Sequence, residues 1–377
     1  MEFQKISVIG LGYIGFPTAC LLASLGFRVS GIDVDQERLK SISSGTISIS
    51  EDGMEELFVK ARKNLYLGAH PKGADVHIIT VPTPVKNHQP DLSHVNDAIN
   101  ALKPVVKPGN LLIVESTCPV GTTDSVAKEF KGVHVAYCPE RVLPGNLISE
   151  LIQNDRIIGG VDPTSSQLAA AFYQKFVTGA LVTTSAKYAE ASKLVENAYR
   201  DVNIAFANEL SMALDDVDVN EVIKLANRHP RVNVLKPGPG VGGHCIPIDP
   251  WFLISKARNQ TPLMQCARQV NESKVQWVIS RILDRAHKTD TTNVLCLGMS
   301  YKANVDDFRE SPSIKIVEAL KNHLSVRYVD PFLPSDDLKT CIEECQMIIG
   351  LVNHTFFELS PSDYPDKHFM DFAEVFS

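Results

Sequence analysis

The hydrophobic positions of the first part of the chain fall into short apolar runs separated by helical stretches. Runs typical of buried strands occupy 6–9, 28–32, 76–81, 111–114 and 133–137. Residues 13–25 have the spacing of a helix between the first two runs. Because strands that alternate with helices usually pair in parallel, this pattern predicts a doubly wound parallel sheet.

One long amphipathic helix is predicted from Ala186 to about Leu214, where neither proline nor glycine interrupts the chain. Its apolar stripe comprises Leu194, Ala198, Val202 and Ala205. A polar face comprises Glu190, Lys193, Asn197 and Arg200. Such a helix has one face to bury and one to present, so we expect it to join two domains and to offer an oligomer interface.

A second α/β pattern begins at Asn293, with strand-like runs at 294–298, 326–331 and 347–352. The fold class is therefore α/β, with two Rossmann-like doubly wound domains joined by a long central helix and a helical middle region. We place the domain boundaries at 1–185, 186–285 and 286–377.

The composition narrows the class of partner. The net charge of −7 at pH 7 leaves no basic field for nucleic acid. The sequence shows neither the pattern of a signal peptide nor an apolar run long enough for a membrane span. The eight cysteines form no CxxC pair and no Cys/His cluster with zinc spacing, so we expect a reduced cytoplasmic protein without a structural metal.

A glycine loop, Gly10-Leu11-Gly12-Tyr13-Ile14-Gly15, follows the first predicted strand and opens the first helix. Its glycines allow a tight turn and close approach of a pyrophosphate, which then faces the helix N-terminus. Asp33 ends the second strand about 20 residues on, where an acceptor for the ribose 2′-hydroxyl is expected. A carboxylate there repels a 2′-phosphate, so we predict NAD rather than NADP. The alternative is a glycine turn without a ligand.

Three further candidates, Thr83, Thr117 and Glu140, follow predicted strands at the same edge of the sheet. Ligands of such sheets lie outside the carboxyl ends of the strands. The threonines can therefore face the dinucleotide, and the carboxylate can activate water. Each has a structural alternative, because threonines also cap the following segment and a glutamate also forms a salt bridge with a neighbouring arginine.

The glycine-rich run from Gly240 to Pro250 contains Cys245. A thiol on such a loop, in a chain with a dinucleotide site, indicates oxidation of an aldehyde through a thioester. Asp249 lies within reach if the loop turns into a helix, and His244 either helps to form a thiolate or faces the substrate. Simple packing is the alternative for the thiol.

Lys193 and Asn197 lie one turn apart on the long helix. A lysine that faces a site stabilises a developing oxyanion, and an amide positions it. A solvated helix face would have the same sequence, so both interpretations remain open at this point.

Taken in chain order, eight segments resemble the UDP-glucose/GDP-mannose dehydrogenase family. They are GLGYIG, TVPTP, ESTCPVGTT, CPERVLPGN, EASKLVENAYRDVNIAFANEL, NRHPRVN, PGPGVGGHCIPIDP and SYKANVDDFRESPS. The resemblance extends over nearly the whole chain, and it is strongest to the branch that acts on N-acetylated sugar nucleotides. It implies NAD-dependent, four-electron oxidation of the C6 alcohol of a UDP-N-acetylhexosamine, for surface polysaccharide precursors. We expect UDP-N-acetyl-D-mannosamine, with the N-acetylglucosamine, N-acetylgalactosamine and glucose nucleotides as alternatives.

The resemblance also implies roles for the candidates and a homodimer. It makes Cys245 the nucleophile and Glu140 the base for thioester hydrolysis. The other implied catalytic residues are Lys193, Asp249, Asn197 and Thr117. Implied cofactor contacts beyond the glycine loop and Asp33 are Thr83, Thr117 and Arg309. Implied substrate contacts are Glu140, Arg141, Lys193, Asn197, Arg200, Arg231, Gly242, His244 and Lys302, with Arg231 supplied by the neighbouring subunit. The middle region then carries the lysine and the thiol, and the C-terminal domain binds the UDP-sugar.

Two other functions remain as alternatives. A two-electron β-hydroxyacid dehydrogenase shares the glycine opening and a helical second domain, but it needs neither a thiol nor a third domain. A non-catalytic nucleotide-binding protein is favoured only by the C-terminal end, 370–377, which lacks the Arg- or Lys-Gly pair usual in the family. We expect that departure to affect the last nucleotide contacts rather than the fold.

Overall fold

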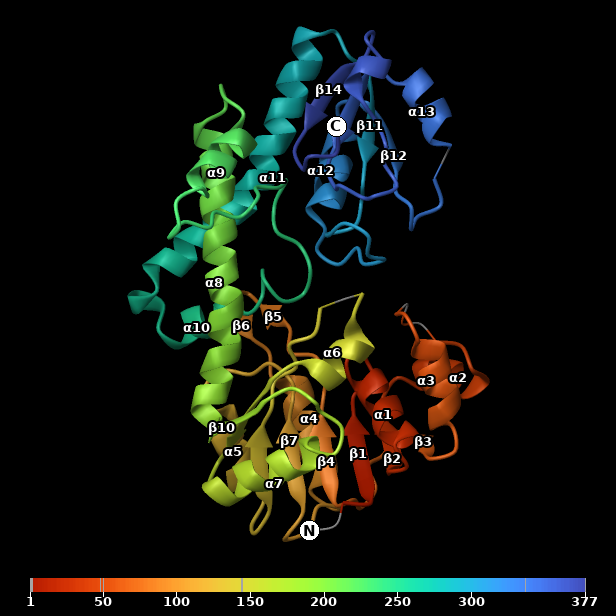
Figure 1. The fold of residues 1–377 in the computed structure, drawn as a ribbon, viewed down its shortest axis with the longest axis vertical. Helices are drawn as coiled ribbons and strands as arrows, with labels where there is room; N and C mark the ends of the chain where they lie inside the picture. The colour runs from red at the N-terminus through yellow and green to blue at the C-terminus, as the bar shows by residue number, and fades with distance from the viewer. Residues whose placement is uncertain (1–2, 48, 50, 144, 336, 377) are drawn as a thin grey trace. The chain divides into compact units, whose positions relative to one another are not determined.

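The structure is a computed structural model that describes residues 3–47, 49, 51–143, 145–335 and 337–376 (Figure 1). The chain divides into two compact units, one of residues 1–195 with 251–256 and one of residues 196–250 with 257–377. The first and last residues of the expected domains, Met1 and Ser377, lie outside the described residues.

An eight-stranded sheet forms the centre of the first unit. In spatial order its strands are β10 (Leu181–Ser185), β9 (Arg156–Gly160), β8 (His134–Tyr137), β7 (Leu111–Val114), β4 (Val76–Ile79), β1 (Lys5–Ile9), β2 (Arg28–Ile32) and β3 (Leu65–Gly68). The six strands from β8 to β3 are parallel and have the order of a dinucleotide-binding domain. Strands β9 and β10 pair in parallel with each other, but β9 is antiparallel to β8. The five strands expected from the apolar runs, β1, β2, β4, β7 and β8, are therefore parallel as predicted. The sequence analysis did not identify β3, β9 or β10 as strands.

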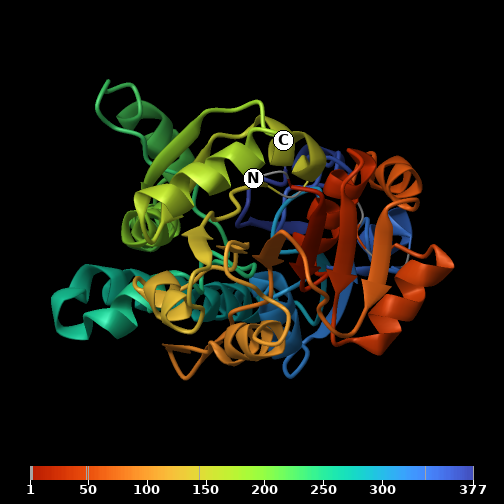
Figure 2. The same cartoon turned by 90° about the horizontal axis from the view of Figure 1, so that it is seen from below.

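Helices cover both faces of this sheet. They are α1 (Gly15–Ser24), α2 (Gln36–Ser44), α3 (Met54–Ala61), α4 (Ser93–Leu102), α5 (Thr122–Lys128), α6 (Leu147–Gln153) and α7 (Pro163–Tyr173). Side chains of α1, α3 and α7 form one buried cluster, and those of α4 and α5 form another. Figure 2 shows the ribbon of these helices and strands from below. A hairpin of β5 (Val85–Lys86) and β6 (Gln89–Pro90) follows β4, and α10 (Pro250–Lys256) also belongs to this unit except for its first residue.

The long helix predicted from Ala186 is confirmed as α8 (Ala186–Ala213). Leu194, Ala198 and Ala205 of its apolar stripe are buried. Part of the expected polar face is buried as well, because the Glu190 carboxylate accepts hydrogen bonds from the backbone N–H groups of Gly121 and Thr123, at 2.6 and 2.7 Å. Glu190 thus fixes the start of α5 against α8.

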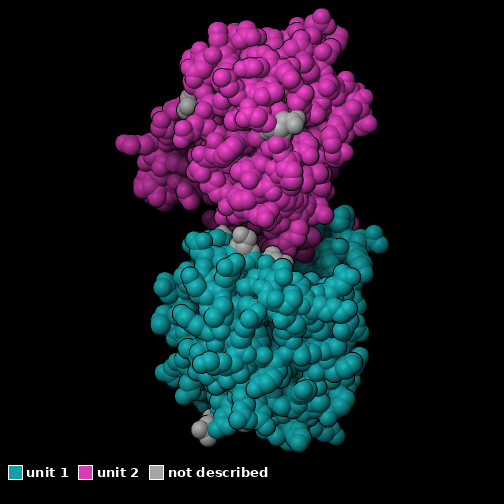
Figure 3. All heavy atoms as spheres, turned by 90° about the vertical axis from the view of Figure 1, so that its right-hand side faces the viewer, with its two compact units in different colours: residues 1–195, 251–256 teal, residues 196–250, 257–377 magenta. Residues whose placement is uncertain are grey.

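The second unit, magenta in Figure 3, contains a four-stranded parallel sheet. Its strands in spatial order are β12 (Ser325–Val329), β11 (Asn293–Leu297), β13 (Met347–Gly350) and β14 (His368–Asp371). Its helices after α8 are α9 (Val219–Ala226), α11 (Pro262–Lys288), α12 (Pro312–Leu320) and α13 (Leu338–Glu344), with short 3₁₀ turns η1 (Arg258–Gln260) and η2 (Pro361–Asp363). The expected second α/β region is confirmed. In the described part of the chain, no helix has both the length and the apolar character needed to cross a membrane.

Buried polar contacts fix α11 against the second half of α8. Arg268 donates to Asp201 at 2.6 Å, and both side chains are almost completely buried. Asn271 donates to the same carboxylate at 2.8 Å and accepts from Asn208 at 2.9 Å. Since a buried charge is tolerated only with such partners, these contacts set the register of the two helices.

Candidate functional site

The glycine loop leaves room for a ligand at one position and packs tightly at the others. Gly10 has φ +94°, and a Cβ there would lie 2.9 Å from the Thr80 carbonyl oxygen. A Cβ on Gly15 would lie 1.8 Å from the Gly10 carbonyl oxygen, whereas one on Gly12 would meet nothing within 4 Å. The loop therefore has open space at Gly12, two residues before Ile14 at the N-cap of α1, and this space fits the pyrophosphate of NAD. Tyr13 lies between them.

Asp33 follows β2 directly and is buried. Its carboxylate accepts from the Leu11 N–H of the glycine loop at 2.8 Å. It also pairs with Arg38 at 2.8 Å, an arginine on α2 that the sequence analysis missed. The pair gives the expected ribose acceptor a fixed orientation and a counter-charge.

Thr83 and Thr117 are half-buried and follow β4 and β7, at the carboxyl edge of the sheet. The helices that come next, α4 and α5, have Leu92 and Gly121 at their N-cap positions. Neither threonine is therefore a helix N-cap, so the capping alternative is wrong.

Glu140 lies just past β8 and forms a buried ion pair. One oxygen accepts from Arg156 at 2.6 Å, and the other accepts from the N–H groups of Arg141 and Val142 at 2.6 and 3.0 Å. The two charged side chains are 7% and 3% exposed. The salt bridge that we gave as the alternative for Glu140 is therefore present, and its arginine, Arg156, lies in β9. The adjacent Arg141 is half-buried.

A second carboxyl group lies beside this pair. Glu115, at the end of β7, accepts from the Tyr173 hydroxyl at 2.5 Å. Burial raises the pKa of Glu115 to about 7, while the nearby Arg156 lowers it and the Glu140 carboxylate raises it. Sequence patterns gave no sign of this cluster, because its members come from four separate segments.

The structure brings Cys245, Asp249 and Asn197 together. The Cys245 carbonyl accepts from the Asp249 N–H at 2.8 Å, so the glycine-rich loop turns back on itself at the thiol. The Asp249 carboxylate is buried and accepts from the Asn197 amide on α8 at 2.5 Å. Cys245 is half-buried. Six of the other cysteines are buried, and burial raises the pKa of Cys20 and Cys138 to about 12.

The run from Gly240 to Pro250, which contains Cys245, is called here the thiol loop. Tyr301, which the sequence analysis did not single out, packs against it. A Cβ on Gly243, at φ +85°, would lie 2.9 Å from its ring, and one on Gly242 would lie 2.7 Å from its Cβ. Burial raises the pKa of Tyr301, with smaller effects from the nearby Asp307, Cys245, Arg309 and Arg200. Arg309 pairs with Asp307 through two nitrogens, and the Arg309 carbonyl accepts from the Gly243 N–H at 3.0 Å.

The remaining candidates lie at or near the surface. Lys193 is half-buried on α8, one turn before Asn197. Exposed positions are Arg200, Arg231, His244 and Lys302. Their shared role in binding the substrate stays a prediction. Within the same described part, no three His, Cys, Asp or Glu side chains gather as metal ligands do.

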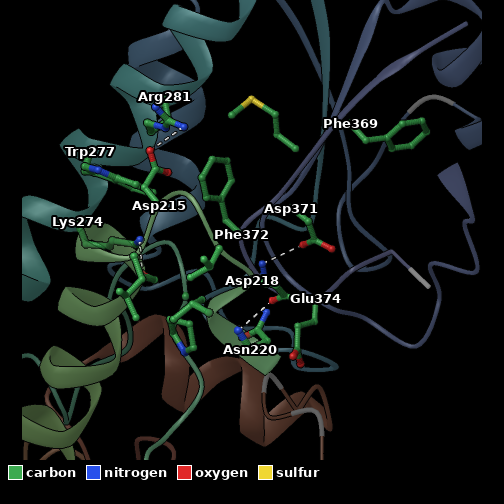
Figure 4. A pocket seen from close by; sticks show the side chains of 18 of the residues that line it. Asp215, Asp218, Asn220, Lys274, Trp277, Arg281, Phe369, Asp371, Phe372 and Glu374 are labelled. Carbon is green, nitrogen blue, oxygen red and sulfur yellow. Dashed lines mark hydrogen bonds and ion pairs between the residues drawn. The ribbon is translucent and has the colours of Figure 1, made fainter. Parts of the chain in front are cut away.

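The second unit also contains a cavity of about 400 Å³ (Figure 4). It is lined by the end of α8, the start of α9, residues 237–238, α11 and residues 369–374. Trp277 lies 3.8 Å from the ammonium of Lys274, and burial lowers the pKa of Lys274 to about 8. None of the predicted site residues is among its described lining, but the divergent C-terminal end is. That divergence therefore maps to this cavity.

Comparisons with known proteins agree over nearly the whole chain. Three family models match: the NAD binding domain of the UDP-glucose/GDP-mannose dehydrogenase family at residues 4–177, its central domain at 187–273 and its UDP binding domain at 295–370. The UDP-N-acetyl-D-mannosamine dehydrogenase of Methanocaldococcus jannaschii is 45% identical, over 93% of this chain and 86% of that protein. The NDP-N-acetyl-D-galactosaminuronic acid dehydrogenase of Ralstonia nicotianae is 43% identical, over 96% and 94%.

Solved structures give the same result. The UDP-N-acetyl-D-mannosamine dehydrogenase of Pyrococcus horikoshii has a TM-score of 0.94 and 37% identity, covering 99% of this chain and 96% of that one. The first model match includes the glycine loop and Asp33, so the cofactor is NAD. The chain therefore belongs to the UDP-glucose/GDP-mannose dehydrogenase family, and it is an NAD-dependent dehydrogenase of nucleotide sugars with a UDP binding domain.

Proposed function

We propose that this protein oxidises the C6 alcohol of a UDP-N-acetylhexosamine, UDP-N-acetyl-D-mannosamine before others, to the uronic acid through a thioester on Cys245. The observation that carries the proposal is the geometry of the thiol loop. There the Asp249 N–H donates to the Cys245 carbonyl, and the Asp249 carboxylate accepts from the Asn197 amide. A half-buried thiol beside an oriented carboxylate is the arrangement that covalent aldehyde oxidation requires.

NAD, when bound, accepts a hydride in each of the two oxidations. In the first, Asp249 and Lys193, together with a water molecule, take up the proton that leaves the C6 hydroxyl and stabilise the oxyanion. The Cys245 thiol then adds to the aldehyde carbon, and its proton passes to the carbonyl oxygen to give a thiohemiacetal. After the second oxidation, water adds to the thioester carbon, releases the acid and returns the proton to sulfur. The covalent bond keeps the aldehyde in the site between the two steps.

Glu140 is our candidate base for the last step. Its two oxygens are fixed by Arg156 and by two backbone N–H groups, which gives the carboxylate one orientation at the carboxyl edge of the sheet. A general base must be so placed to remove a proton from water. Thr117 follows the adjacent β7 and is our candidate both to contact the cofactor and to take part in catalysis.

The substrate assignment rests on similarity and on chemistry. Relatives that share 40–45% identity are named for UDP-N-acetyl-D-mannosamine, and one at 43% is named for an N-acetylgalactosamine derivative. The axial 2-acetamido group of the mannosamine sugar needs a polar partner, for which Arg200, Asn203 and His244 are the candidates. The N-acetylglucosamine, N-acetylgalactosamine and glucose nucleotides remain the alternatives. The match to a UDP binding domain argues against a β-hydroxyacid dehydrogenase.

The division of the chain and its assembly are part of the proposal. Residues 1–185 bind NAD, 186–285 carry Lys193 and the thiol loop, and 286–377 bind the UDP-sugar. Four large apolar side chains on α8 are exposed: Tyr188, Val195, Tyr199 and Phe206. Their spacing of seven, four and seven residues places them on one stripe, which a second copy of the helix can cover to form a homodimer. In that dimer the exposed Arg231 is available to the neighbouring site. We further propose that the enzyme works in the cytoplasm and supplies a surface polysaccharide precursor.

A substrate panel tests the proposal. The full chain is incubated with NAD and one of four UDP-sugars: the N-acetylmannosamine, N-acetylglucosamine, N-acetylgalactosamine or glucose nucleotide. We expect two NADH per sugar consumed and the highest kcat/KM with the mannosamine. UDP-glucose should be poorer by ~10⁴-fold, since a site built to hydrogen-bond an amide rejects an analogue without it. Progress curves that end at one NADH contradict the thioester route. A best rate with UDP-glucose overturns the branch, and a best rate with another N-acetylated sugar overturns only the epimer.

A further inference from the structure

A histidine that no sequence pattern indicated joins three segments of the C-terminal sheet. His354 follows β13 and is completely buried. Its Nε2 lies 3.2 Å from an Asp330 carboxylate oxygen and 3.1 Å from the Ser300 hydroxyl. Its Nδ1 accepts the backbone N–H of Asn304 at 3.0 Å. The ring therefore bridges the ends of β11, β12 and β13.

The partners fix which nitrogen carries the proton. Because Nδ1 accepts a backbone N–H, the neutral ring of His354 has its hydrogen on Nε2 and donates it toward Asp330. The Asp330 carboxylate also accepts from the N–H groups of Met299 and Ser300, at 2.6 and 3.1 Å. Burial by itself would raise the pKa of Asp330, but the bonds from His354, Met299 and Phe332 lower it below its ordinary value. An ionised Asp330 thus holds both the ring and the backbone where β11 ends.

Ser300, His354 and Asp330 have the residue types of a hydrolytic triad, but their geometry serves another purpose. The Ser300 hydroxyl is fully buried and donates to the Lys302 carbonyl oxygen at 2.7 Å. A serine whose proton is directed to a backbone carbonyl, without access to solvent, does not act as a nucleophile on a bound substrate. The cluster holds backbone instead.

The segment that it holds is Ser300–Arg309, called here the lysine loop, which contains Lys302 and Arg309. Asn304 within it has φ +59°, a conformation that an L residue keeps only when its surroundings enforce it. Its N–H is bound by His354, and its side-chain oxygen accepts from the Thr355 N–H at 3.0 Å. Two adjacent residues after β13 therefore fix this strained position from both sides.

The lysine loop in turn contacts the thiol loop. The Arg309 carbonyl accepts from the Gly243 N–H at 3.0 Å, and the Tyr301 ring fills the space beside Gly243. The Tyr301 N–H bonds to the Asp307 carbonyl at 3.0 Å and closes the loop on itself. Any change that releases Asn304 thus reaches the segment two residues from Cys245.

We propose that His354 is a positioning residue, which holds the lysine loop in the conformation that binds the UDP part of the substrate. It acts through Asn304 and Asp330 rather than by touching the nucleotide. The inference rests on the proposed function only in taking the lysine loop as part of the nucleotide-sugar site. Loss of His354 should then weaken binding of the nucleotide more than it slows the chemical steps.

Three substitutions separate the two nitrogens. His354→Asn places an amide oxygen near the position of Nδ1 and keeps the acceptor for Asn304. His354→Gln places an amide nitrogen near Nε2 and keeps the donor toward Asp330, whereas His354→Leu keeps neither. Ile349→Val, in β13 and equally buried, is the control for general loss of packing in the same strand.

The readouts are the Kd of UDP by calorimetry, KM and kcat with the best nucleotide sugar, and amide hydrogen exchange of residues 301–309. We expect His354→Leu to raise the Kd of UDP by about tenfold or more, since two buried hydrogen bonds that hold the loop are lost. KM should rise by more than kcat falls, and exchange in the loop should accelerate. His354→Asn should recover most of the slow exchange, and Ile349→Val should lower Tm without changing any of these values.

Several results overturn the inference. One is a Kd of UDP in His354→Leu within twofold of that in Ile349→Val. Another is amide hydrogen exchange at residues 301–309 that stays unchanged in any folded variant without an acceptor for the Asn304 N–H. If His354→Leu does not fold, the other two variants decide. The inference is overturned when His354→Asn and His354→Gln both match the unsubstituted protein in the Kd of UDP and in exchange at 301–309. Failure of the proposed function looks different, because it appears as full turnover by Cys245→Ala or as absence of UDP binding, and the exchange measurement still decides the role of His354.

Discussion

Replacing Arg156 by methionine tests how far Glu140 depends on its buried partner. The two side chains are 3% and 7% exposed and 2.6 Å apart. Methionine has a similar length but no charge, so the Glu140 carboxylate would remain buried with only two backbone N–H donors. Breaking one side of a buried ion pair costs about 3–5 kcal/mol. Arg156→Met should therefore lower the free energy of unfolding of the first unit by about that amount.

A double-mutant cycle with Glu140→Gln measures the coupling. The glutamine oxygen still accepts the two backbone N–H groups, so this single change should be milder. The double variant should lose less than the sum of the singles by about 2 kcal/mol, because neither charge is then left alone. Urea unfolding followed by Trp251 fluorescence, in a Trp277→Phe background, reports on the first unit, since these are the two tryptophans of the chain.

The chemical part of the same experiment is the mass of the protein during turnover. If Glu140 activates water, Glu140→Gln should accumulate the acyl group on Cys245, visible in intact-protein mass spectra. Arg156→Met should do the same at a temperature where it is folded, because the carboxylate loses its fixed orientation. If the changes in the free energy of unfolding caused by Arg156→Met and Glu140→Gln simply add in the double variant, the coupling between the two side chains is refuted. Absence of an acyl adduct in Glu140→Gln, with turnover slowed, refutes the role of Glu140 as the base.

Four other predictions follow from named contacts. Cys245→Ala should abolish uronic acid formation while NAD binding survives in calorimetry, and normal turnover would contradict the nucleophile. Asp33→Asn should raise the efficiency with NADP relative to NAD, because Arg38 is released from its carboxylate and can meet a 2′-phosphate; an unchanged ratio counts against this. Burial raises the pKa of Glu115 from 4.5 to about 7, so its contribution to stability is full below about pH 4.5 and falls by about 3 kcal/mol as pH rises through 7. Urea titrations of Glu115→Gln should lack that slope, and an unchanged slope refutes the burial argument. Phe206→Asp should convert a dimer to monomer in light scattering, and an unaltered mass contradicts an interface on α8.

The positions that follow directly from the sequence are those where backbone geometry limits the residue type. Gly10 and Gly15 are glycines because a Cβ would collide with the Gly10 carbonyl or with Thr80. Asp33 follows β2, and Cys245 lies in a turn whose glycines allow it. In each case one short segment contains both the structural constraint and the chemical group, so a pattern of a few residues is sufficient to find it.

The groups that sequence reasoning missed are pairs of side chains from distant segments. Arg156 starts β9 and reaches Glu140, Arg38 reaches Asp33 from α2, and His354 reaches Asn304 fifty residues earlier in the chain. Periodicity measures whether a residue is buried, but the identity of a buried partner depends on the fold. Strands β9 and β10 were not predicted at all. The antiparallel pairing of β9 with β8 does not follow from the sequence either, because a run of apolar residues is identical in parallel and antiparallel pairing.

The thiol loop shows why these distant partners matter for chemistry. Its glycines allow the backbone several conformations, but a nucleophile has to be held in one position. A displacement of about 1 Å lowers rates by ~10²-fold. Two contacts remove that freedom from opposite ends: Asn197 bonds to the Asp249 carboxylate, and the Arg309 carbonyl bonds to the Gly243 N–H. The first partner is on α8, whose register is set by Arg268 and Asn271, and the second is on the lysine loop. A flexible loop thus becomes a fixed site because two rigid elements hold it, so substitutions in those elements should slow chemistry even where they touch no substrate.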